Sequence, residues 1–571
     1  MRKLCATDQS CAENCEHKSR SAWEVLPYSR IEDLVETIAT HSKAPREFVL
    51  KKAHTRYFKG YFKGYFKHRS IAAKSMVVES DYIDQGYLDD FAEYYIHCFS
   101  HYKKRCTRVH FFSKSFTTQY FGDLLQGIFP TGSSLERELQ KLRKAYRGFM
   151  VIKPLPETVI GRTCLKTYPD LPKRHYRGIT TYKANLFGIE LEVESLPFQE
   201  QDSVVAACAT SALWSVLHAT SRKLGHRILS PAAITKIAYQ ARPDSDGQFP
   251  SRGLDKDQMS CAMRTLGLEV DVVTAIGTDS SWFKAVLYAY LRNGLPILFV
   301  FTLIDVLSDE ETEIDELHAV AVAGYSRAGA TVPTSNHRFR LRAEAIDRIY
   351  AHDDGLGPFA KMLIDGKQVK IIAEGDDSTP LIAQGDEFFS LSTSWVSERD
   401  GASNLRAIPE CLLVPLPALV KLKFGCIYDV VHSFSGALSG AWCRHLTLGE
   451  EIEWSIYLTS TNELKKELLV EAKKSGLQGT ELQKALTKGF PKYVWRAKAL
   501  NGEMSWLDLF FDATAIEQDS YMIHAIKYDK MFWQVTIIAL EEKHTQQTLR
   551  GKDGAKVLEW FLREKLISKE C

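Results

Sequence analysis

The amino-acid sequence predicts an α+β protein of several domains. In a central stretch, from about Leu196 to Ile364, helical segments come first and strand segments follow, an order typical of α+β domains. The regions before and after it mix helical and strand patterns. A chain of 571 residues is long enough for about three to four domains. We therefore expect an N-terminal mixed α/β region at 1–195, a central domain at 196–365 and a C-terminal mixed α/β region at 366–571.

The N-terminal region predicts two amphipathic helices and two strands. Residues 89–102 carry aromatic side chains at helical spacing, and residues 132–146 repeat that pattern with leucines. Residues 148–155 are typical of a strand. In residues 189–196, apolar side chains alternate with glutamates, as in a strand with one exposed face.

The central domain predicts helices followed by strands. One helix holds Cys208, and a second covers residues 282–294. The strands that follow are expected at residues 296–304, 317–325 and 346–354. In the C-terminal region, we expect strands at 453–460, 521–528 and 532–542 and a closing helix at 555–566.

Composition and charge exclude several classes of protein. Lys and Arg number 73 against 71 Asp and Glu, so a net charge of +2 gives no global attraction to nucleic acid or membrane. The longest apolar stretch, residues 296–304, is far shorter than the roughly 20 residues of a spanning helix. The N-terminus lacks the apolar core of a secretory signal, and the twelve cysteines are scattered. We therefore expect a cytoplasmic protein with free thiols.

A basic and aromatic repeat, YFKGYFKGYFKHR, occupies residues 57–69. Aromatic rings between cations can stack on bases while Lys59, Lys63 and Lys67 neutralise phosphates, which suggests a weak contact with nucleic acid or an anionic surface. The alternative is an exposed loop or an edge strand, where lysines discourage aggregation.

Four residue types needed for thiol catalysis follow one another along the central domain. Cys208 lies where an apolar helix begins, after the possible caps Asp202 and Ser203, and a helix N-terminus favours a thiolate. His318 opens the strand LHAVAVAGY and can act as the base. Asp353, or its neighbour Asp354, ends the next strand and can orient that base.

The fourth role, that of oxyanion donor, suits a side-chain amide. Gln201 precedes Cys208 by seven residues, and Gln199 is also in range. The sequence leaves both pairs of alternatives open, Asp353 against Asp354 and Gln201 against Gln199.

These motifs resemble the papain-like cysteine peptidase superfamily, and most closely its bacteriocin-processing branch. The resemblance rests on a Gln, a Cys at the head of a helix, the His strand HAVAVAGY and an Asp before a glycine, and it covers about Leu196 to Ile364. It implies a Cys-bearing helix packed on an antiparallel sheet, with Cys208 as nucleophile, His318 as general base and acid, Asp353 as orienting group and Gln201 as oxyanion donor. Ala209 departs from the family, which usually has glycine after the cysteine.

The function we expect is that of a cysteine peptidase or amidohydrolase, which cleaves an amide bond of a protein or peptide without a metal or organic cofactor. A transglutaminase, acyltransferase or deamidase would use the same triad. An inactive peptidase-like scaffold with a nucleic-acid-binding segment is the alternative from another class. Two further groups have weaker metal-ligand spacing, the first formed by Cys5, Cys11, Cys15 and His17 and the second by His97, His101, Cys106 and His110.

Overall fold

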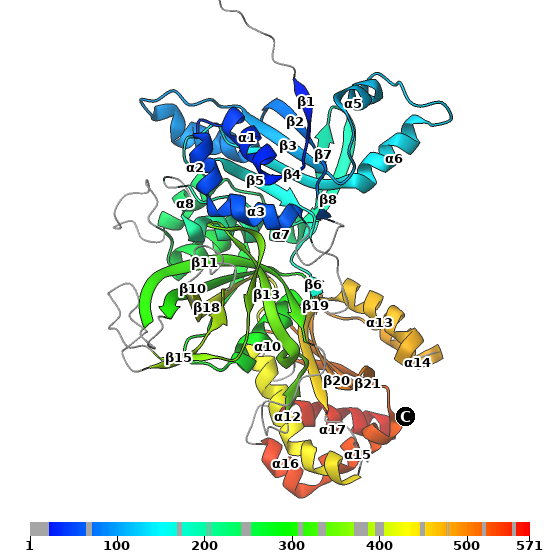
Figure 1. Ribbon diagram of the computed structural model, residues 1–571. Coiled ribbons are helices and arrows are strands. Elements are labelled where there is room, and N and C mark those ends of the chain that lie inside the picture. The colour runs from blue at the N-terminus through cyan, green and yellow to red at the C-terminus, as the bar shows by residue number, and fades with distance from the viewer. Residues whose placement is uncertain are drawn as a thin grey trace, which may run out of the picture.

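The structure is a computed structural model in which three large sheets, built mainly from antiparallel strand pairs, follow one another along the chain (Figure 1). The N-terminal sheet lies at one end, the central sheet in the middle and the C-terminal sheet toward the other end. The residues that the structure describes are 22–570, apart from 64–70, 168–173, 203, 205–206, 241–252, 307–311, 329–338, 371–385, 394–404, 446–451, 476, 478, 517–520 and 551–554.

The N-terminal region is a five-stranded antiparallel sheet with helices and a separate hairpin. The sheet has the order β1-β2-β3-β4-β5, with strands β1 (Trp23–Pro27), β2 (Ser75–Tyr82), β3 (Cys106–Phe112), β4 (Tyr146–Ile152) and β5 (Ile160–Leu165). The hairpin pairs β7 (Thr180–Leu186) with β8 (Ile189–Ser195). The helices are α1 (Ile31–His41), α2 (Arg46–Lys51), α3 (Ala53–Phe62), α4 (Gln85–Glu93), α5 (Thr118–Leu125) and α6 (Leu135–Ala145), with a 3₁₀ turn η3 (Tyr95–His97).

Two predictions for this region are wrong. The helix expected over residues 89–102 begins earlier, at Gln85, where the Asp84 side chain accepts a hydrogen bond from the Tyr87 amide, and it ends at Glu93. The basic and aromatic repeat is neither an exposed loop nor an edge strand in its described part, because residues up to Phe62 belong to helix α3. Its aromatic side chains pack into the core.

The central sheet closes on itself. Its strands have the order β10-β11-β13-β14-β17-β18-β9, and β18 also pairs with β10, so that six of them form a ring. The strands are β9 (Leu268–Thr274), β10 (Ile297–Val306), β11 (Thr312–Arg327), β13 (Ile346–Asp353), β14 (Gly357–Leu363), β17 (Leu391–Ser392) and β18 (Leu405–Pro417), and β6 (Arg174–Tyr176) pairs with β11. The boundary expected at residue 365 therefore falls inside this sheet.

Helix α7 is the central helix of this part of the molecule. It runs over Cys208–Leu224 and packs on β11, β10 and β13. Residues 209–220 are buried, because helices α8 (Pro231–Tyr239) and α9 (Lys256–Thr265) and Tyr182 of the N-terminal hairpin pack on the helix beside the central sheet. Helix α10 (Ser280–Leu291) also belongs to this region, and a small hairpin pairs β15 (Gln368–Lys370) with β16 (Glu387–Phe389).

The C-terminal sheet has the order β12-β19-β20-β21-β22. Its first strand comes from the segment between His318 and Asp353, so this region is joined to the central one by strand pairing. The strands are β12 (Arg340–Leu341), β19 (Glu453–Ser460), β20 (Tyr493–Asn501), β21 (Met504–Asp512) and β22 (Met522–Lys527), and a 3₁₀ turn η4 covers Arg342–Ala345. The helices are α12 (Phe424–His445), α13 (Thr461–Ser475), α14 (Gly479–Thr487), α15 (Lys530–Glu541), α16 (Lys543–Arg550) and α17 (Ala555–Glu570).

The strand predicted at residues 532–542 is wrong, because these residues form most of helix α15. Phe532, Thr536, Ala539 and Leu540 are buried, which is helical rather than alternating spacing. Asp529 caps this helix by accepting a hydrogen bond from the Phe532 amide at 2.7 Å.

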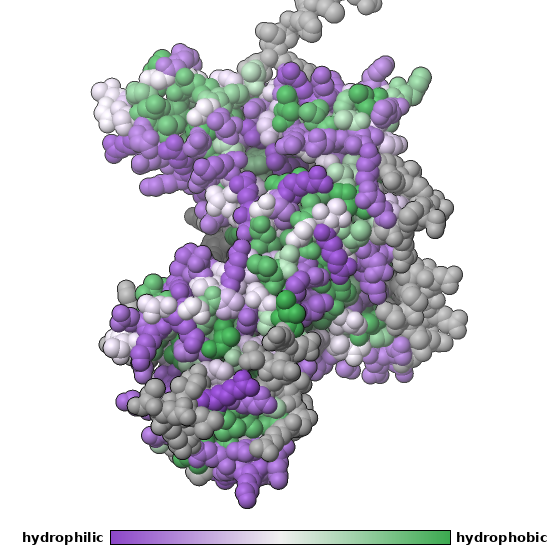
Figure 2. Space-filling model, turned by 180° about the vertical axis from the view of Figure 1, so that it is seen from behind, coloured by the Kyte–Doolittle hydropathy of each residue, from purple (hydrophilic) through white to green (hydrophobic). Residues whose placement is uncertain are grey.

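The predicted α+β class is confirmed at the level of mixed helices and antiparallel sheets. No helix in the described part of the chain is long and apolar enough to cross a membrane. Every cysteine whose side chain is described is a free thiol. Figure 2 shows mostly hydrophilic side chains on the face seen from behind, with hydrophobic ones in small separate patches.

Candidate active site

Cys208 is the first residue of helix α7. Ala207 is the N-cap and offers no side-chain hydrogen bond, so the predicted cap Asp202 is wrong. The Asp202 side chain instead accepts hydrogen bonds from the Val204 amide, at 2.9 Å, and from the Tyr95 hydroxyl, and Ser203 lies outside the described residues. Because Cys208 occupies the first turn, the positive end of the helix dipole lies at its side chain.

Strand β11 of the central sheet places His318 beside Cys208. It lies on β11 opposite Phe301 of β10, and the two rings pack edge to face at 5.5 Å. Its Nε2 donates a hydrogen bond to Asp353 Oδ2 at 3.0 Å. A second hydrogen bond joins the imidazole to the Cys208 side chain. Because Nε2 is engaged by the carboxylate, Nδ1 is the ring nitrogen left for the thiol.

The pKa of His318 lies well above its ordinary value. Burial by itself lowers this pKa, but the charge of Asp353 and the hydrogen bond to it outweigh that effect, and the hydrogen bond to Cys208 and the charge of Asp354 add to it. Asp354 Oδ1 lies 3.6 Å from Nε2, against 3.0 Å for Asp353 Oδ2. Asp353 is therefore the direct partner, and Asp354 acts through its charge.

The turn after β13 holds the Asp353 carboxylate in place. Asp353 Oδ1 accepts a hydrogen bond from the Gly355 amide at 3.0 Å, so each oxygen of the carboxylate has its own donor. His352 anchors the same turn from the other side of the strand. Its Nδ1 accepts from the Phe359 amide at 3.1 Å, which leaves Nε2 to donate to the Leu196 carbonyl at 2.8 Å.

Helix α3 of the N-terminal region packs against this turn. His54 Nε2 donates a hydrogen bond to the Asp354 carbonyl at 2.7 Å, and the Tyr57 hydroxyl donates to the Pro358 carbonyl. A Cβ at Gly357 would collide with the Tyr57 ring, so the close approach requires glycine. Sequence reasoning missed this role, because nothing in the repeat itself indicates which surface the aromatic face of α3 covers.

The same packing bears on the predicted nucleic-acid contact. Stacking on bases requires accessible rings, whereas Tyr57, Phe58, Tyr61 and Phe62 are buried. Lys59 and Lys63 are exposed, and Lys67 lies outside the described residues. The described part of the repeat therefore serves the core.

Gln201 lies at the surface close to the cluster of Cys208, His318 and Asp353. It lines two adjoining depressions of about 330 and 340 Å³, together with Ala207 in one and Asp354 in the other. Phe48 and Lys52 of the N-terminal region line both depressions. Gln199 is buried, and its Nε2 has no hydrogen-bond partner in the described part of the chain. Of the two glutamines, Gln201 is the one placed where a substrate could reach it.

One group of side chains in the described residues has the composition of a metal site. His318, Asp353 and Asp354 each offer a ligand atom, and these atoms lie within 4.8 Å of one another. Cys5, Cys11, Cys15 and His17 lie outside the described residues. In the other set, His97 and His101 are exposed, whereas Cys106 and His110 are buried on β3.

Comparisons with known proteins found no relative. Neither a scan against protein-family models nor a search of curated proteins gave a match. The geometry around Cys208 is therefore the feature from which a function can be inferred.

Proposed function

We propose that this chain is a cysteine peptidase or amidohydrolase that uses Cys208, His318 and Asp353 to cleave an amide bond of a protein or peptide. The observation that carries the proposal is the continuous chain of contacts from a thiol at a helix N-terminus, through a buried imidazole, to a carboxylate at 3.0 Å. These are the three roles that thiol acyl chemistry needs.

The chemistry follows from where the protons lie. An imidazolium beside a helix N-terminus favours a thiolate, whose sulfur attacks the substrate carbonyl carbon and forms a thioester bond. His318 gives its proton to the leaving nitrogen as the C–N bond breaks. Water, deprotonated by His318, then attacks the thioester carbon, the C–S bond breaks and the acid product leaves.

The oxyanion of each tetrahedral intermediate needs donors that are already in place. The Cys208 backbone amide, at the start of α7, is one of the four helix amides without an intrahelical acceptor. We assign the second donor to the Gln201 side chain, since it lines the depressions beside Ala207 and Asp354. Phe48, which is 39% exposed there, offers an apolar contact for a substrate side chain.

The same arrangement supports a papain-like central domain, with the Cys-bearing helix packed on the antiparallel sheet that supplies His318 and Asp353. The assignment is a proposal that joins the sequence resemblance to this packing.

The pH dependence of Cys208 alkylation tests the proposal. Iodoacetamide labelling is followed at each cysteine by mass spectrometry of the digested protein, with the exposed Cys426 as the reference thiol in the same chain. We expect Cys208 to react well below pH 7, and His318→Ala to slow this reaction at pH 6 by about 100-fold. A matched variant, His97→Ala, removes an exposed histidine and leaves the reaction unchanged.

Two results would overturn the proposal. One is wild-type Cys208 that follows the pH profile of Cys426 or stays unlabelled at pH 8.5. The other is a His318→Ala protein that keeps its melting temperature and labels at the wild-type rate. Repeating the labelling with EDTA tests whether His318, Asp353 and Asp354 hold a metal ion instead. If they do, EDTA changes the labelling rate of Cys208. A thiolate–imidazolium pair without a metal labels at the same rate with and without EDTA.

Product masses separate hydrolysis from the related reactions. A peptide mixture treated with wild type or Cys208→Ala is analysed with and without an added primary amine. Hydrolysis gives two shorter peptides, acyl transfer gives an adduct with the amine, and deamidation converts a glutamine to a glutamate without chain cleavage.

A further inference from the structure

A second, larger cavity lies between the central and C-terminal sheets. Its volume is about 740 Å³, within the range of small-molecule sites. β6, β11 and α10 line one side, and β19, β20 and β21 line the other. It is separate from the candidate active site. Arg327, which lines it, follows His318 by nine positions on β11, roughly 30 Å along an extended strand.

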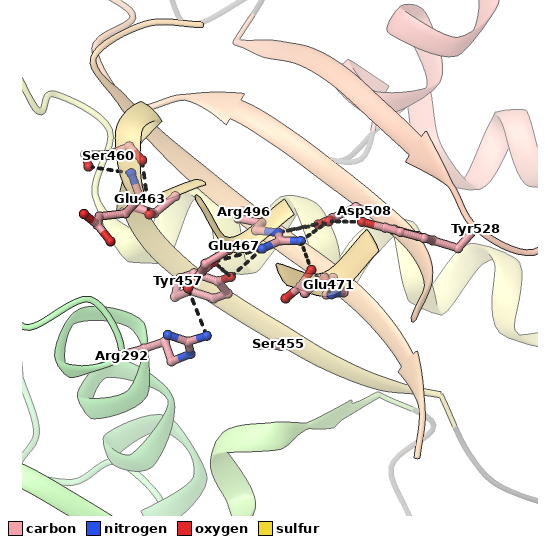
Figure 3. A network of polar contacts seen from close by, with 12 residues as sticks. Arg292, Ser455, Tyr457, Ser460, Glu463, Glu467, Glu471, Arg496, Asp508 and Tyr528 are labelled. Carbon is pink, nitrogen blue, oxygen red and sulfur yellow. Dashed lines mark hydrogen bonds and ion pairs between the residues drawn. The ribbon is translucent and has the colours of Figure 1, made fainter. Parts of the chain in front are cut away.

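Part of the charge in this cavity is neutralised within the protein. Lys498 pairs with Glu471 at 2.6 Å, and Arg342 pairs with Glu503. Arg292 pairs with Glu467 at 3.0 Å and lies over the Tyr457 ring (Figure 3). The third acid of the lining, Asp529, is engaged as the cap of α15.

Two further arginines in the lining, Arg177 and Arg327, form no ion pair with a described carboxylate. Within the described part of the chain, neither Arg177 nor Arg327 has a carboxylate within 4 Å, and the buried Nε of Arg327 has no hydrogen-bond partner there. The His175 ring packs at a tilt against the Tyr325 ring, with the ring centroids 5.1 Å apart, and its buried Nε2 is likewise without a partner in these residues. A buried guanidinium donor without a partner, such as Arg327 Nε, calls for an acceptor from outside the described residues.

The electrostatic field at this point is positive. Burial and the charges of Arg327, Arg177, Arg292 and Arg342, in that order, lower the pKa of His175 to about 4. Four guanidinium groups therefore act on one imidazole, and their joint field would be relieved by a negative ligand.

We propose that this cavity binds a small phosphorylated molecule, held through its phosphate oxygens by Arg177 and Arg327. Guanidinium groups match phosphate oxygens with paired, charge-assisted hydrogen bonds. Tyr288, Tyr325 and Trp506 line the same cavity and provide ring surfaces for an aromatic or sugar portion of the ligand.

Calorimetric titration of the full chain tests this site. The probes are inorganic pyrophosphate, ATP and, as the uncharged counterpart, adenosine, all at one ionic strength. We expect saturable binding of pyrophosphate or ATP at one site per chain and none of adenosine alone. Arg327→Met and Arg177→Met each weaken binding by about ten-fold or more, because each removes a charge-assisted contact. Arg137→Met, at an exposed position of α6, leaves the affinity unchanged.

Three results would overturn the proposal. The first is wild-type protein that binds neither phosphate probe. The second is an equal affinity for citrate and pyrophosphate, which would identify a general anion site. The third is binding that survives in both folded variants. Arg177 is exposed, so we expect the Arg177→Met protein to fold normally. If Arg327→Met fails to fold, its loss of binding does not count as support, and the Arg177→Met protein alone decides the test.

Discussion

In the described part of the chain, the buried charge clusters around His318 and around Arg496 differ in how completely their polar groups are satisfied. Arg496 is fully buried beside the fully buried Asp508. Its Nε donates to Asp508 Oδ2 at 2.9 Å, its Nη1 to Glu467 Oε2 at 2.9 Å and its Nη2 to Glu471 Oε2 at 2.7 Å (Figure 3). His318 has a carboxylate on one ring nitrogen only, and its other contact is the half-buried thiol of Cys208.

Under the proposed function, this difference separates a structural ion network from a reactive one. In the Arg496 cluster, three carboxylates surround the guanidinium. These ion pairs join β20, β21 and α13. In the His318 cluster, Asp354 and Ala207, the neighbours of Asp353 and Cys208 in the chain, line the two surface depressions. Buried charge alone therefore does not indicate catalysis, whereas a buried charge with one open, nucleophilic neighbour does.

The largest effect is expected from Arg496→Met. Removing the guanidinium leaves Asp508 buried without its cation, which costs about 3–5 kcal/mol in the free energy of unfolding. Urea unfolding followed by circular dichroism measures this loss. The control is Arg143→Met, which removes an exposed pair with Glu136 and costs about 0–1 kcal/mol. Equal costs in the two variants would show that the Arg496 network is not a stabilising centre.

Asp353→Asn is expected to act on reactivity rather than on folding. Asp353 raises the pKa of His318, so its loss lowers that pKa and leaves less imidazolium beside the thiol at neutral pH. Alkylation of Cys208 at pH 6 should fall by about 10–100-fold, and thiolate absorbance at 240 nm should rise only at a higher pH than in wild type.

Asp354→Asn provides the matched comparison, because its carboxylate lies farther from the imidazole, at 3.6 Å. Its effect on the same two measurements should have the same sign and a smaller size. If Asp354→Asn had the larger effect, the orienting role would belong to Asp354.

Gln201→Ala is expected to separate acylation from alkylation. Alkylation forms no oxyanion, so the rate with iodoacetamide should stay within about two-fold of wild type. Acylation by p-nitrophenyl acetate passes through an oxyanion and should slow by about ten-fold or more. Gln199→Ala is the control, and a selective loss of acylation in that variant would transfer the role to Gln199.

The smallest effect is expected from Tyr57→Phe. The change removes the hydroxyl that donates to the Pro358 carbonyl, which should lower the free energy of unfolding by about 1 kcal/mol. Because the Asp353 carboxylate keeps its bonds to Gly355 and His318, alkylation of Cys208 should change by less than about two-fold. A large loss of reactivity would show that α3 positions the acid as well as covering it.

Local sequence patterns predicted much of the candidate site. The apolar run after residue 207 indicated a helix with Cys208 near its start, and the run LHAVAVAGY indicated a strand that carries His318. Asp353 before a glycine indicated a strand end at a turn, as found. The prediction that Asp202 caps helix α7 was wrong, because a polar side chain near a helix start can accept hydrogen bonds from other groups. The Asp202 side chain accepts from the Val204 amide and the Tyr95 hydroxyl.

What the sequence determined by itself about this protein is the conformation of single segments, since the periodicity of apolar side chains and the turn-forming residues act over a few positions. What only the tertiary structure decided is which faces meet. It put α3 against the Asp353 turn, added β18 to the central sheet and gathered arginines from residues 177–342 around one cavity. Such contacts join residues far apart in the chain, and no local pattern records the partner that a buried face will find.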